Sequence, residues 1–316
     1  MDRNLALEFV RVTEAAAIAA AEWIGYGEAK KADGAAVDAM RSRFNQIDFA
    51  GTVVIGEGQK DEAPELYVGE TIGTGAGPAM EIAVDPLECT DSVAHGRYNA
   101  MAVIVAGPVG SLFRAPDTYM NKIAVGPEAA GVIDLDATPT ENVLKVAQKL
   151  GKDTREITVM VLDRPRHTSL VEELRAAGAR VRMVSDGDVA TAVATCMPEH
   201  DIDMVMGIGG STEAVLAAAP VKIMGGQLLA RFTPPNDKHA AVIANAGYDT
   251  KKIYTAEDLA HGRQLTFTAT GIIDGPLLRG VITRQRFIET HSLVLRGSSG
   301  TARYISTHHD AYKASS

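Results

Sequence analysis

The second half of the chain constrains the fold most, because apolar segments of strand length alternate there with segments of helical periodicity. These segments are expected in the order helix 140–151, strand 157–162, helix 168–177, strand 179–184, helix 188–196, strand 203–208 and helix 212–222. Such alternation predicts an α/β fold, in which a parallel or mixed sheet is covered by helices on both faces.

The remaining segments predict a second lobe that also mixes helix and sheet. They are helices at 5–26 and 34–46, strands at 52–56 and 80–84, and a hairpin of strands at 100–106 and 111–114. The tail, residues 264–308, returns to β patterning around glycines and is expected to form antiparallel hairpins. We therefore expect an α+β lobe over 1–155, and an α/β lobe with C-terminal β hairpins over 156–316.

Composition narrows the class of partner. A formal charge of −9 over 316 residues disfavours nucleic acid and anionic membranes as ligands, because the field of the whole protein repels them. Two cysteines make no disulfide framework, and the charged N-terminus lacks the apolar core of a signal peptide. No uncharged run is long enough to span a bilayer as a helix. These features predict a cytoplasmic protein.

Carboxylates gather after predicted strands or beside glycines. They are Asp33, Glu57, Asp61, Glu62, Asp85, Glu88, Asp186, Asp188 and Glu213. Any one of them alone is more simply explained as a solvated turn or a helix cap. Their conjunction favours a site for hard cations such as Mg²⁺ or Mn²⁺, which prefer oxygen ligands and leave room for water and phosphate.

The stretch A-V-D-P-L-E-C-T-D, residues 83–91, is the most specific of these motifs. It places three acids and a threonine directly after an apolar strand, where an unpaired carboxylate would cost several kcal/mol. Pro86 restricts the turn, and Thr90 is suited to begin a helix whose amide dipoles favour an anion. A cation and a phosphate together would explain this arrangement.

Seven ordered motifs carry a resemblance to a known family. They are A-D-G-A-A-V-D-A-M, V-I-G-E-G-x-x-D-E-A-P, A-V-D-P-L-E-x-T, A-P-D-T-Y-M, R-P-R-H, D-G-D-V-A and G-I-G-G. Over nearly its whole length the chain resembles the class II (GlpX-type) fructose-1,6-bisphosphatases, which belong to the lithium-sensitive, metal-dependent sugar phosphatases. The resemblance implies a layered α/β/α/β/α sugar-phosphatase fold, like that of inositol monophosphatase. It also implies hydrolysis of the 1-phosphate of fructose 1,6-bisphosphate to give fructose 6-phosphate, a step of gluconeogenesis.

Position by position, the resemblance assigns residues to three roles. The implied metal ligands, for two or three Mn²⁺ or Mg²⁺ ions, are Asp33, Glu57, Asp85, Glu88 and Glu213, with the carbonyl of Leu87 as a further candidate. The implied catalytic residues, which orient or activate the attacking water, are Asp33, Asp61 and Thr90. The implied substrate-binding residues are Glu88, Cys89, Thr90, Tyr119, Arg164, Arg166, Asp186, Asp188 and Gly210. The first lobe would thus bind metal and the second substrate, and a homo-oligomer (dimer or tetramer) is expected.

These assignments suit the chemistry, since phosphoryl transfer depends chiefly on positioning and charge neutralisation. Arg164 and Arg166 would grip the phosphate that is not cleaved, and Asp186 and Asp188 would bind sugar hydroxyls. His167, beside the arginines, is expected to be structural, because metal-activated water already supplies the nucleophile.

The chain departs from the family pattern at residue 89, where Cys89 replaces an expected glycine. Three interpretations remain open: a tolerated or weakening substitution, a redox-sensitive brake on phosphate binding, or, least favoured, a nucleophile. Gly-Gly-Ser-Thr-Glu-Ala at 209–214 and the acidic Asp91 are further departures, and both bear on affinity more than on reaction type.

Two alternatives to a fructose-1,6-bisphosphatase stay open, and one is disfavoured. The first is a broader sugar bisphosphatase that includes sedoheptulose 1,7-bisphosphate among its substrates. The second is a catalytically weak sugar-phosphate binder, which Cys89 and Asp91 would explain. A nucleotide-binding Rossmann protein is disfavoured, because G-I-G-G-S-T lacks the G-x-G-x-x-G spacing.

Overall fold

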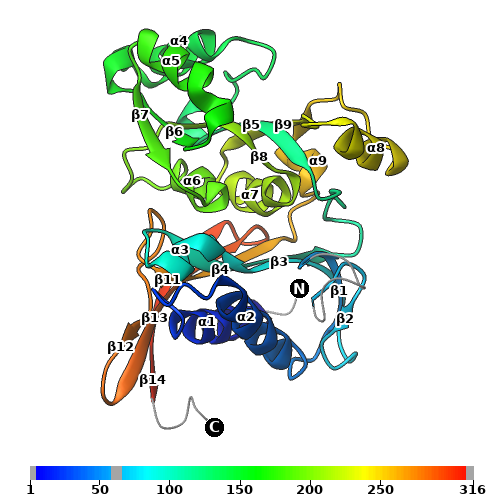
Figure 1. The fold of residues 1–316 in the computed structure, drawn as a ribbon. Helices are drawn as coiled ribbons and strands as arrows, with labels where there is room; N and C mark the ends of the chain where they lie inside the picture. Colours follow the sequence, from blue (N-terminus) through cyan, green and yellow to red (C-terminus); the bar gives the residue numbers. More distant parts are fainter. Residues whose placement is uncertain (1–4, 58–65, 311–316) are drawn as a thin grey trace. The chain divides into compact units, whose positions relative to one another are not determined.

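The computed structural model describes residues 5–57 and 66–310. The chain forms two compact units: Met1–Leu112 together with Gly262–Ser316 make unit 1, and Phe113–His261 make unit 2. The expected boundary near residue 155 therefore falls inside unit 2, in the 3₁₀ helix η2 (Thr154–Glu156). Each unit is built around one mixed sheet with helices packed on it, which agrees with the expected α/β class (Figure 1).

The sheet of unit 1 has eight strands in the order β12-β13-β11-β4-β3-β1-β2, with β14 paired to β13. Among the described strands of this sheet, β1 and β3 are parallel neighbours and the other pairs are antiparallel. The strands are β1 (Ala50–Ile55), β2 (Thr71–Ile72), β3 (Ala79–Glu88), β4 (Ala100–Pro108), β11 (Thr266–Ile273), β12 (Ile282–Thr283), β13 (Phe287–Arg296) and β14 (Thr301–Asp310).

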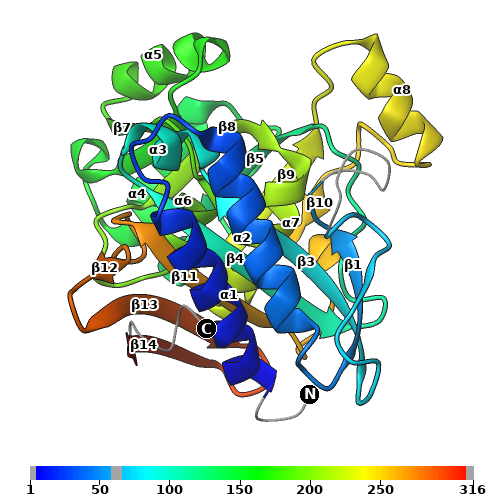
Figure 2. The same cartoon turned by 60° about the horizontal axis from the view of Figure 1, so that its bottom comes forward.

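Two long helices, α1 (Leu5–Ala21) and α2 (Ala29–Phe44), lie side by side against this sheet (Figure 2). The rings of Phe9 in α1, Phe44 in α2 and Phe49, which directly precedes β1, meet with centroids 5.5 to 6.1 Å apart. All three side chains are buried in the core of the unit. A short third helix, α3 (Thr90–His95), begins directly after β3 and packs against α2.

The C-terminal tail belongs to unit 1 and not to the unit that precedes it in sequence. β11 pairs with β4 in an antiparallel register from Thr266 opposite Ala106 to Ile273 opposite Ala100. This pairing joins the tail to the N-terminal sheet. The expected hairpin of 100–106 with 111–114 is wrong, because β4 pairs with β3 and β11 and residues 111–114 form no strand. The tail is antiparallel, as expected, and β13 with β14 forms a long hairpin.

The sheet of unit 2 has six strands in the order β10-β9-β5-β8-β6-β7. β8, β6 and β7 are parallel, while β5, β9 and β10 join by antiparallel pairing. The strands are β5 (Tyr119–Val125), β6 (Thr158–Leu162), β7 (Arg180–Val184), β8 (Met204–Gly210), β9 (Gln227–Phe232) and β10 (Tyr254–Thr255). The helices are η1 (Pro127–Ala129), α4 (Pro139–Leu150), η2, η3 (Pro165–His167), α5 (Thr168–Ala176), α6 (Asp188–Ala194), α7 (Ser211–Ile223), α8 (Asp237–Asn245) and α9 (Ala256–Leu259).

Helices cover both faces of this sheet, as the sequence predicts. Alternate residues of the strands, such as Ile123 and Val159, share an apolar cluster with α4 and α5. The residues between them, such as Ala124 and Met160, face Ala192 of α6 and Ala217 of α7. The same two pairs of helices lie on opposite sides of the sheet in Figure 1.

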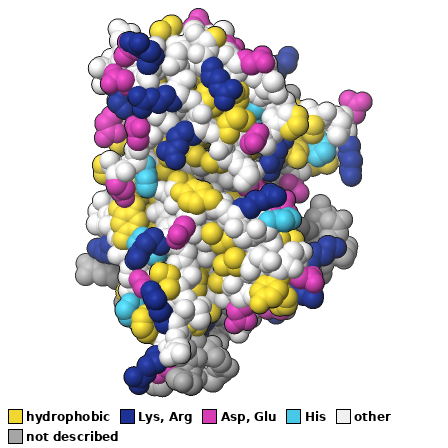
Figure 3. All heavy atoms as spheres, turned by 60° about the vertical axis from the view of Figure 1, so that its left-hand side comes forward, with side chains coloured by type: hydrophobic (Ala, Val, Ile, Leu, Met, Phe, Trp, Pro, Cys, Tyr) yellow, Lys and Arg dark blue, Asp and Glu magenta, His cyan; other side chains and the backbone are white. Residues whose placement is uncertain are grey.

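The surface shows no segregation of charge on the face drawn in Figure 3, where basic and acidic side chains are interspersed. Within residues 5–57 and 66–310, no helix has both the length and the apolar character needed to cross a bilayer.

Candidate active site

An open pocket lies at one edge of the sheet of unit 2. Its volume, including the part open to solvent, is about 780 Å³. It brings together all seven site residues that the sequence predicts in this unit: Tyr119, Arg164, Arg166, Asp186, Asp188, Gly210 and Glu213. Asp117, Thr118, Leu162, Gly209 and His239 complete its lining.

The strand order explains why a pocket forms at this edge. The parallel strands β6 and β8 are neighbours, yet β6 leads to α5 on one face of the sheet and β8 leads to α7 on the other. Strands that diverge in this way leave a crevice at their carboxyl ends, where open α/β sheets bind ligands. β5 runs antiparallel to β8, so that its first residue, Tyr119, lies at the same edge.

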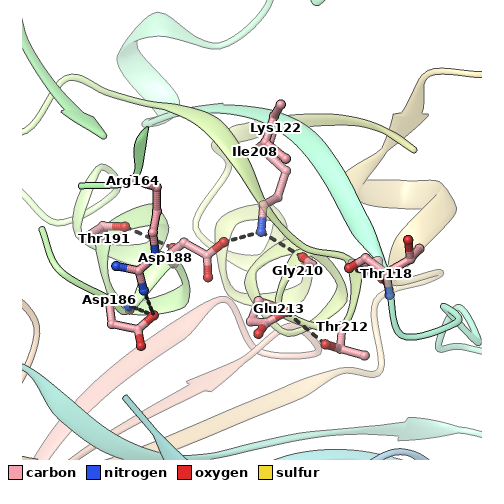
Figure 4. A network of polar contacts seen from close by, with 12 residues as sticks. Thr118, Lys122, Arg164, Asp186, Asp188, Thr191, Ile208, Gly210, Thr212 and Glu213 are labelled. Carbon is pink, nitrogen blue, oxygen red and sulfur yellow. Dashed lines mark hydrogen bonds and ion pairs between the residues drawn. The ribbon is translucent and has the colours of Figure 1, made fainter. Parts of the chain in front are cut away.

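The two arginines of the pocket are held by different contacts. Arg166 donates from Nε and Nη2 to the carbonyl oxygen of Ile208, at 3.0 and 2.7 Å, and its guanidinium lies 5.3 Å from the ring centre of Tyr119. Arg164 approaches Asp186, with 3.8 Å between Nη2 and Oδ1 (Figure 4). Arg166 is thus oriented by backbone and ring, and its remaining N–H groups are suited to bind phosphate.

Three carboxylates, Asp186, Asp188 and Glu213, share this pocket with the arginines. The pKa of Glu213 is raised, first by burial and then by the negative charge of Asp188, while Lys122 opposes the rise. Thr212 donates a hydrogen bond of 2.8 Å to Oε2 of Glu213. A carboxylate held in such a place gains most from a cation, so that its surroundings fit the predicted role of metal ligand.

Lys122 is the residue of this site that sequence reasoning missed. It lies in the middle of β5, and Figure 4 shows its side chain reaching toward Asp188 and Gly210. The strand itself was not predicted, because Asn121 and Lys122 interrupt the apolar pattern of Y-M-N-K-I-A-V.

His167 is part of the scaffold, in agreement with the sequence expectation. Its Nδ1 lies 2.8 Å from the carbonyl oxygen of Leu162, and its Nε2 accepts a hydrogen bond of 2.8 Å from the backbone N–H of Ile208. This arrangement calls for a neutral ring with the proton on Nδ1. The pKa of His167 is lowered, mainly by burial. The ring therefore links β6 to β8 through two hydrogen bonds, next to the residues that line the pocket.

The remaining predicted residues lie in unit 1. Asp33 is in the first half of α2, Glu57 follows β1, and Asp85 and Glu88 are in β3. Because α2 packs against both β3 and α3, its residues adjoin the segment that carries the two β3 acids. Burial raises the pKa of Asp33, a condition that a neighbouring cation would reverse.

The turn after β3 is closed by local hydrogen bonds. Oδ1 of Asp85 accepts from the backbone N–H of Leu87 at 3.1 Å, and the hydroxyl of Thr90 donates to the carbonyl oxygen of Leu87 at 3.2 Å. Cys89 precedes α3 in the left-handed conformation, with φ of 72°, and its side chain is buried in the core of unit 1. The turn thus requires the backbone geometry that glycine adopts freely.

The donor set fits a hard divalent cation, because every predicted ligand, carboxylate or carbonyl, is an oxygen donor. Asp61 lies outside the described residues, so that its predicted role stays a prediction. Within residues 5–57 and 66–310, no three His, Cys, Asp or Glu side chains are grouped closely enough to hold a metal ion.

The fold and the pocket define an α/β protein in which arginines and carboxylates line one open pocket, a combination suited to a phosphorylated small molecule. The chain belongs to the family of bacterial, glpX-encoded fructose-1,6-bisphosphatases, whose model matches residues 3–309. Fructose-1,6-bisphosphatase 1 class 2 of Escherichia coli (strain K12) is 44% identical over 322 residues, which cover 98% of this chain and 96% of that protein. Fructose-1,6-bisphosphatase class 2 of Shigella flexneri matches to the same extent. The family is one of metal-dependent hydrolases.

Proposed function

We propose that this chain hydrolyses the 1-phosphate of fructose 1,6-bisphosphate and releases fructose 6-phosphate and inorganic phosphate. One observation carries the proposal: the seven residues predicted for substrate and metal in unit 2 all line one pocket, in a chain 44% identical to named fructose-1,6-bisphosphatases. The pocket combines cationic groups for a phosphate with carboxylates for hydroxyls.

The residues of the site have different proposed roles, which follow from the chemistry of their side chains. Arg164 and Arg166 bind the phosphate that is retained, since a guanidinium donates to phosphate oxygens through two parallel N–H groups. Asp186 and Asp188 accept hydrogen bonds from sugar hydroxyls and so fix the orientation of the sugar. In unit 1, Thr90 and Asp33 orient the attacking water, with Asp61 as a second candidate for this role.

Divalent Mn²⁺ or Mg²⁺ would be held by Asp33, Glu57, Asp85, Glu88 and Glu213. When bound, two or three such ions would neutralise phosphoryl oxygens and lower the pKa of a bound water. The raised pKa values of Asp33 and Glu213 support this assignment, because buried carboxylates without a cation are disfavoured in their charged form.

The direct test is release of phosphate from fructose 1,6-bisphosphate by the purified chain, measured with malachite green in Mn²⁺, in Mg²⁺ and in EDTA. Metal-dependent release is expected, and its loss in EDTA should be reversible. Absence of release with either metal would refute the proposal. Arg166→Lys is the matched variant: it keeps the charge but loses the planar fork, so that KM should rise by about tenfold.

A broader bisphosphatase is the second candidate, favoured by a pocket whose charged groups suit one phosphate and a few hydroxyls. The ratio of kcat/KM for sedoheptulose 1,7-bisphosphate and fructose 1,6-bisphosphate decides between them. A ratio near one supports breadth, and a strong preference for the fructose ester rejects it.

We also propose that the protein acts in the cytoplasm, since both cysteines are free thiols. On the family resemblance, we propose that it assembles as a homo-oligomer.

A further inference from the structure

Lys122 is a buried lysine, since only 9% of its side chain is exposed. Lysine is among the residues least often buried, and it stays buried only where its charge is paired. The side chain projects from the face of β5 that packs against α6 and α7, as its neighbours Met120 and Ala124 do. Burial of this charge costs free energy, and packing alone does not require a lysine at this position.

The ammonium group of Lys122 joins three elements of the pocket wall. It forms an ion pair with Oδ2 of Asp188, the first residue of α6. It also donates a hydrogen bond of 2.9 Å to the carbonyl oxygen of Gly210, the last residue of β8 (Figure 4). Both partners line the pocket, whereas the aliphatic stem of Lys122 lies in the apolar layer beneath it.

The fit around this contact is close. A Cβ atom built at Gly209 would overlap Oδ2 of Asp188 and would lie 2.9 Å from Nζ of Lys122. Glycine at 209 therefore leaves room for the carboxylate and ammonium groups to meet. A cation beside the first turns of α6 and α7 is also opposed by the dipoles of both helices, so that helix stability does not explain its presence.

We propose that Lys122 is a positioning residue, which fixes the carboxylate of Asp188 in the orientation that binds a sugar hydroxyl. Oδ2 of Asp188 pairs with Lys122, and the same carboxylate lines the pocket, where it can accept a hydrogen bond from a ligand. The hydrogen bond to Gly210 holds the ammonium group itself, so that its charge stays at a fixed distance from Asp188. This inference rests on the proposed function, because it assigns Asp188 to the sugar.

The test replaces Lys122 by Met, which keeps the length of the stem and removes the charge. With fructose 1,6-bisphosphate and Mn²⁺, KM should rise by about tenfold or more while kcat stays within about threefold, since binding of the sugar is lost in ground and transition states alike. The KM of Lys122→Arg should lie between those of the wild type and the Met variant, raised by about two- to fivefold. The planar guanidinium cannot reproduce both the ion pair with Asp188 and the hydrogen bond to Gly210. Lys152→Met is the control, because Lys152 pairs with Asp203, whose side chain is 8% exposed and does not line the pocket, so that its loss should leave KM unchanged.

Calorimetry separates the sugar contact from the phosphate contact and from the reaction itself. Lys122→Met should bind fructose 6-phosphate about tenfold more weakly and bind inorganic phosphate as the wild type does. This binding measurement remains informative even if the wild type proves inactive. Inactivity of the wild type would refute the proposed function and not the role of Lys122. A folded Met variant with wild-type KM and wild-type affinity for fructose 6-phosphate would overturn the role of Lys122, as would a loss of kcat at unchanged KM. If the Met variant does not fold, the Arg variant decides: a wild-type KM overturns the role and a raised one supports it.

Discussion

The side-chain nitrogen of Asn99 lies 3.8 Å from the sulfur of Cys89, and both residues have left-handed backbones, with φ of 71° and 72°. A residue with a Cβ atom pays roughly 1–2 kcal/mol for this conformation. The sulfur of Cys89 is buried among apolar side chains of unit 1, which offsets that cost. Cysteine is thus accommodated where the family pattern has glycine, with its side chain in the core.

Substitution of Cys89 by Gly and by Ala separates strain from packing. Both variants lose the buried sulfur, but only the glycine variant relieves the left-handed backbone. The glycine variant should therefore be more stable than the alanine variant by about 1 kcal/mol, measured by urea denaturation. Equal stability of the two would show that the backbone at 89 is not strained.

The same pair tests whether Cys89 weakens phosphate binding. Because the side chain is buried in the core, Cys89→Gly should leave KM for fructose 1,6-bisphosphate within about threefold of the wild type. A larger fall in KM would instead support the interpretation that the cysteine obstructs the phosphate. Preincubation with peroxide, with the glycine variant as control, tests the redox interpretation.

Gly210 offers a prediction about the geometry of Glu213. A Cβ atom at 210 would overlap Oε2 of Glu213 and would lie 2.6 Å from its Cδ. Gly210→Ala should therefore displace the predicted metal ligand and lower kcat/KM by about tenfold or more, while thermal unfolding shows a folded protein. A higher Mn²⁺ concentration should restore part of the activity. An alanine variant with wild-type metal dependence would remove Glu213 from the ligand set.

The sequence predicted local structure well where periodicity was clear. β6, α5, β7, α6, β8 and α7 all lie within a few residues of the expected segments. β5 and β9 were not expected: Asn121 and Lys122 interrupt the apolar pattern of β5, and these strands pair with distant partners. The boundary near 155 was wrong because β5, which precedes it in the sequence, pairs with β8 and β9, which follow it. The tail was placed in the second lobe because its pairing with β4 joins residues more than 150 positions apart.

In the candidate site, too, features that are local in sequence could be predicted and features that depend on distant partners could not. Arg164, Asp186 and Glu213 could be named from motifs because each motif is local in sequence. Lys122 could not, because its meaning depends on the ion pair with Asp188 in another element. Nor could a sequence show that Cys89 points into the core, since that depends on packing between α2, α3 and β3.

Glu213 should make the metal-free protein less stable as pH rises. Its folded-state pKa is raised above the ordinary value of 4.5, first by burial and then by Asp188, so that ionisation is harder in the folded than in the unfolded chain. The stability linked to its protonation is complete below pH 4.5 and is lost as pH rises through the raised pKa. Glu213→Gln should therefore unfold at a higher temperature than the wild type in EDTA at pH 7, and the difference should vanish near pH 4.

Metal should reverse that order. Mn²⁺ at about a hundred times its Kd should stabilise the wild type by about 2.7 kcal/mol. The Gln variant, which lacks a carboxylate ligand, should gain less. If Mn²⁺ stabilises both proteins equally, Glu213 does not bind the metal.

His167 should matter for stability much more than for catalysis. Gln cannot bridge the carbonyl of Leu162 and the N–H of Ile208 at once, so that His167→Gln should lose about 1–3 kcal/mol of stability at pH 8. Because burial lowers the folded-state pKa below 6.5, the wild type is stabilised above pH 6.5 and loses that stability as pH falls. The gap between the two proteins, measured by urea denaturation, should therefore narrow toward pH 5.5. Removal of a general base lowers kcat by roughly 10²- to 10⁴-fold. We expect His167→Gln to lower kcat by no more than about tenfold, and a larger loss would make His167 a participant in the reaction.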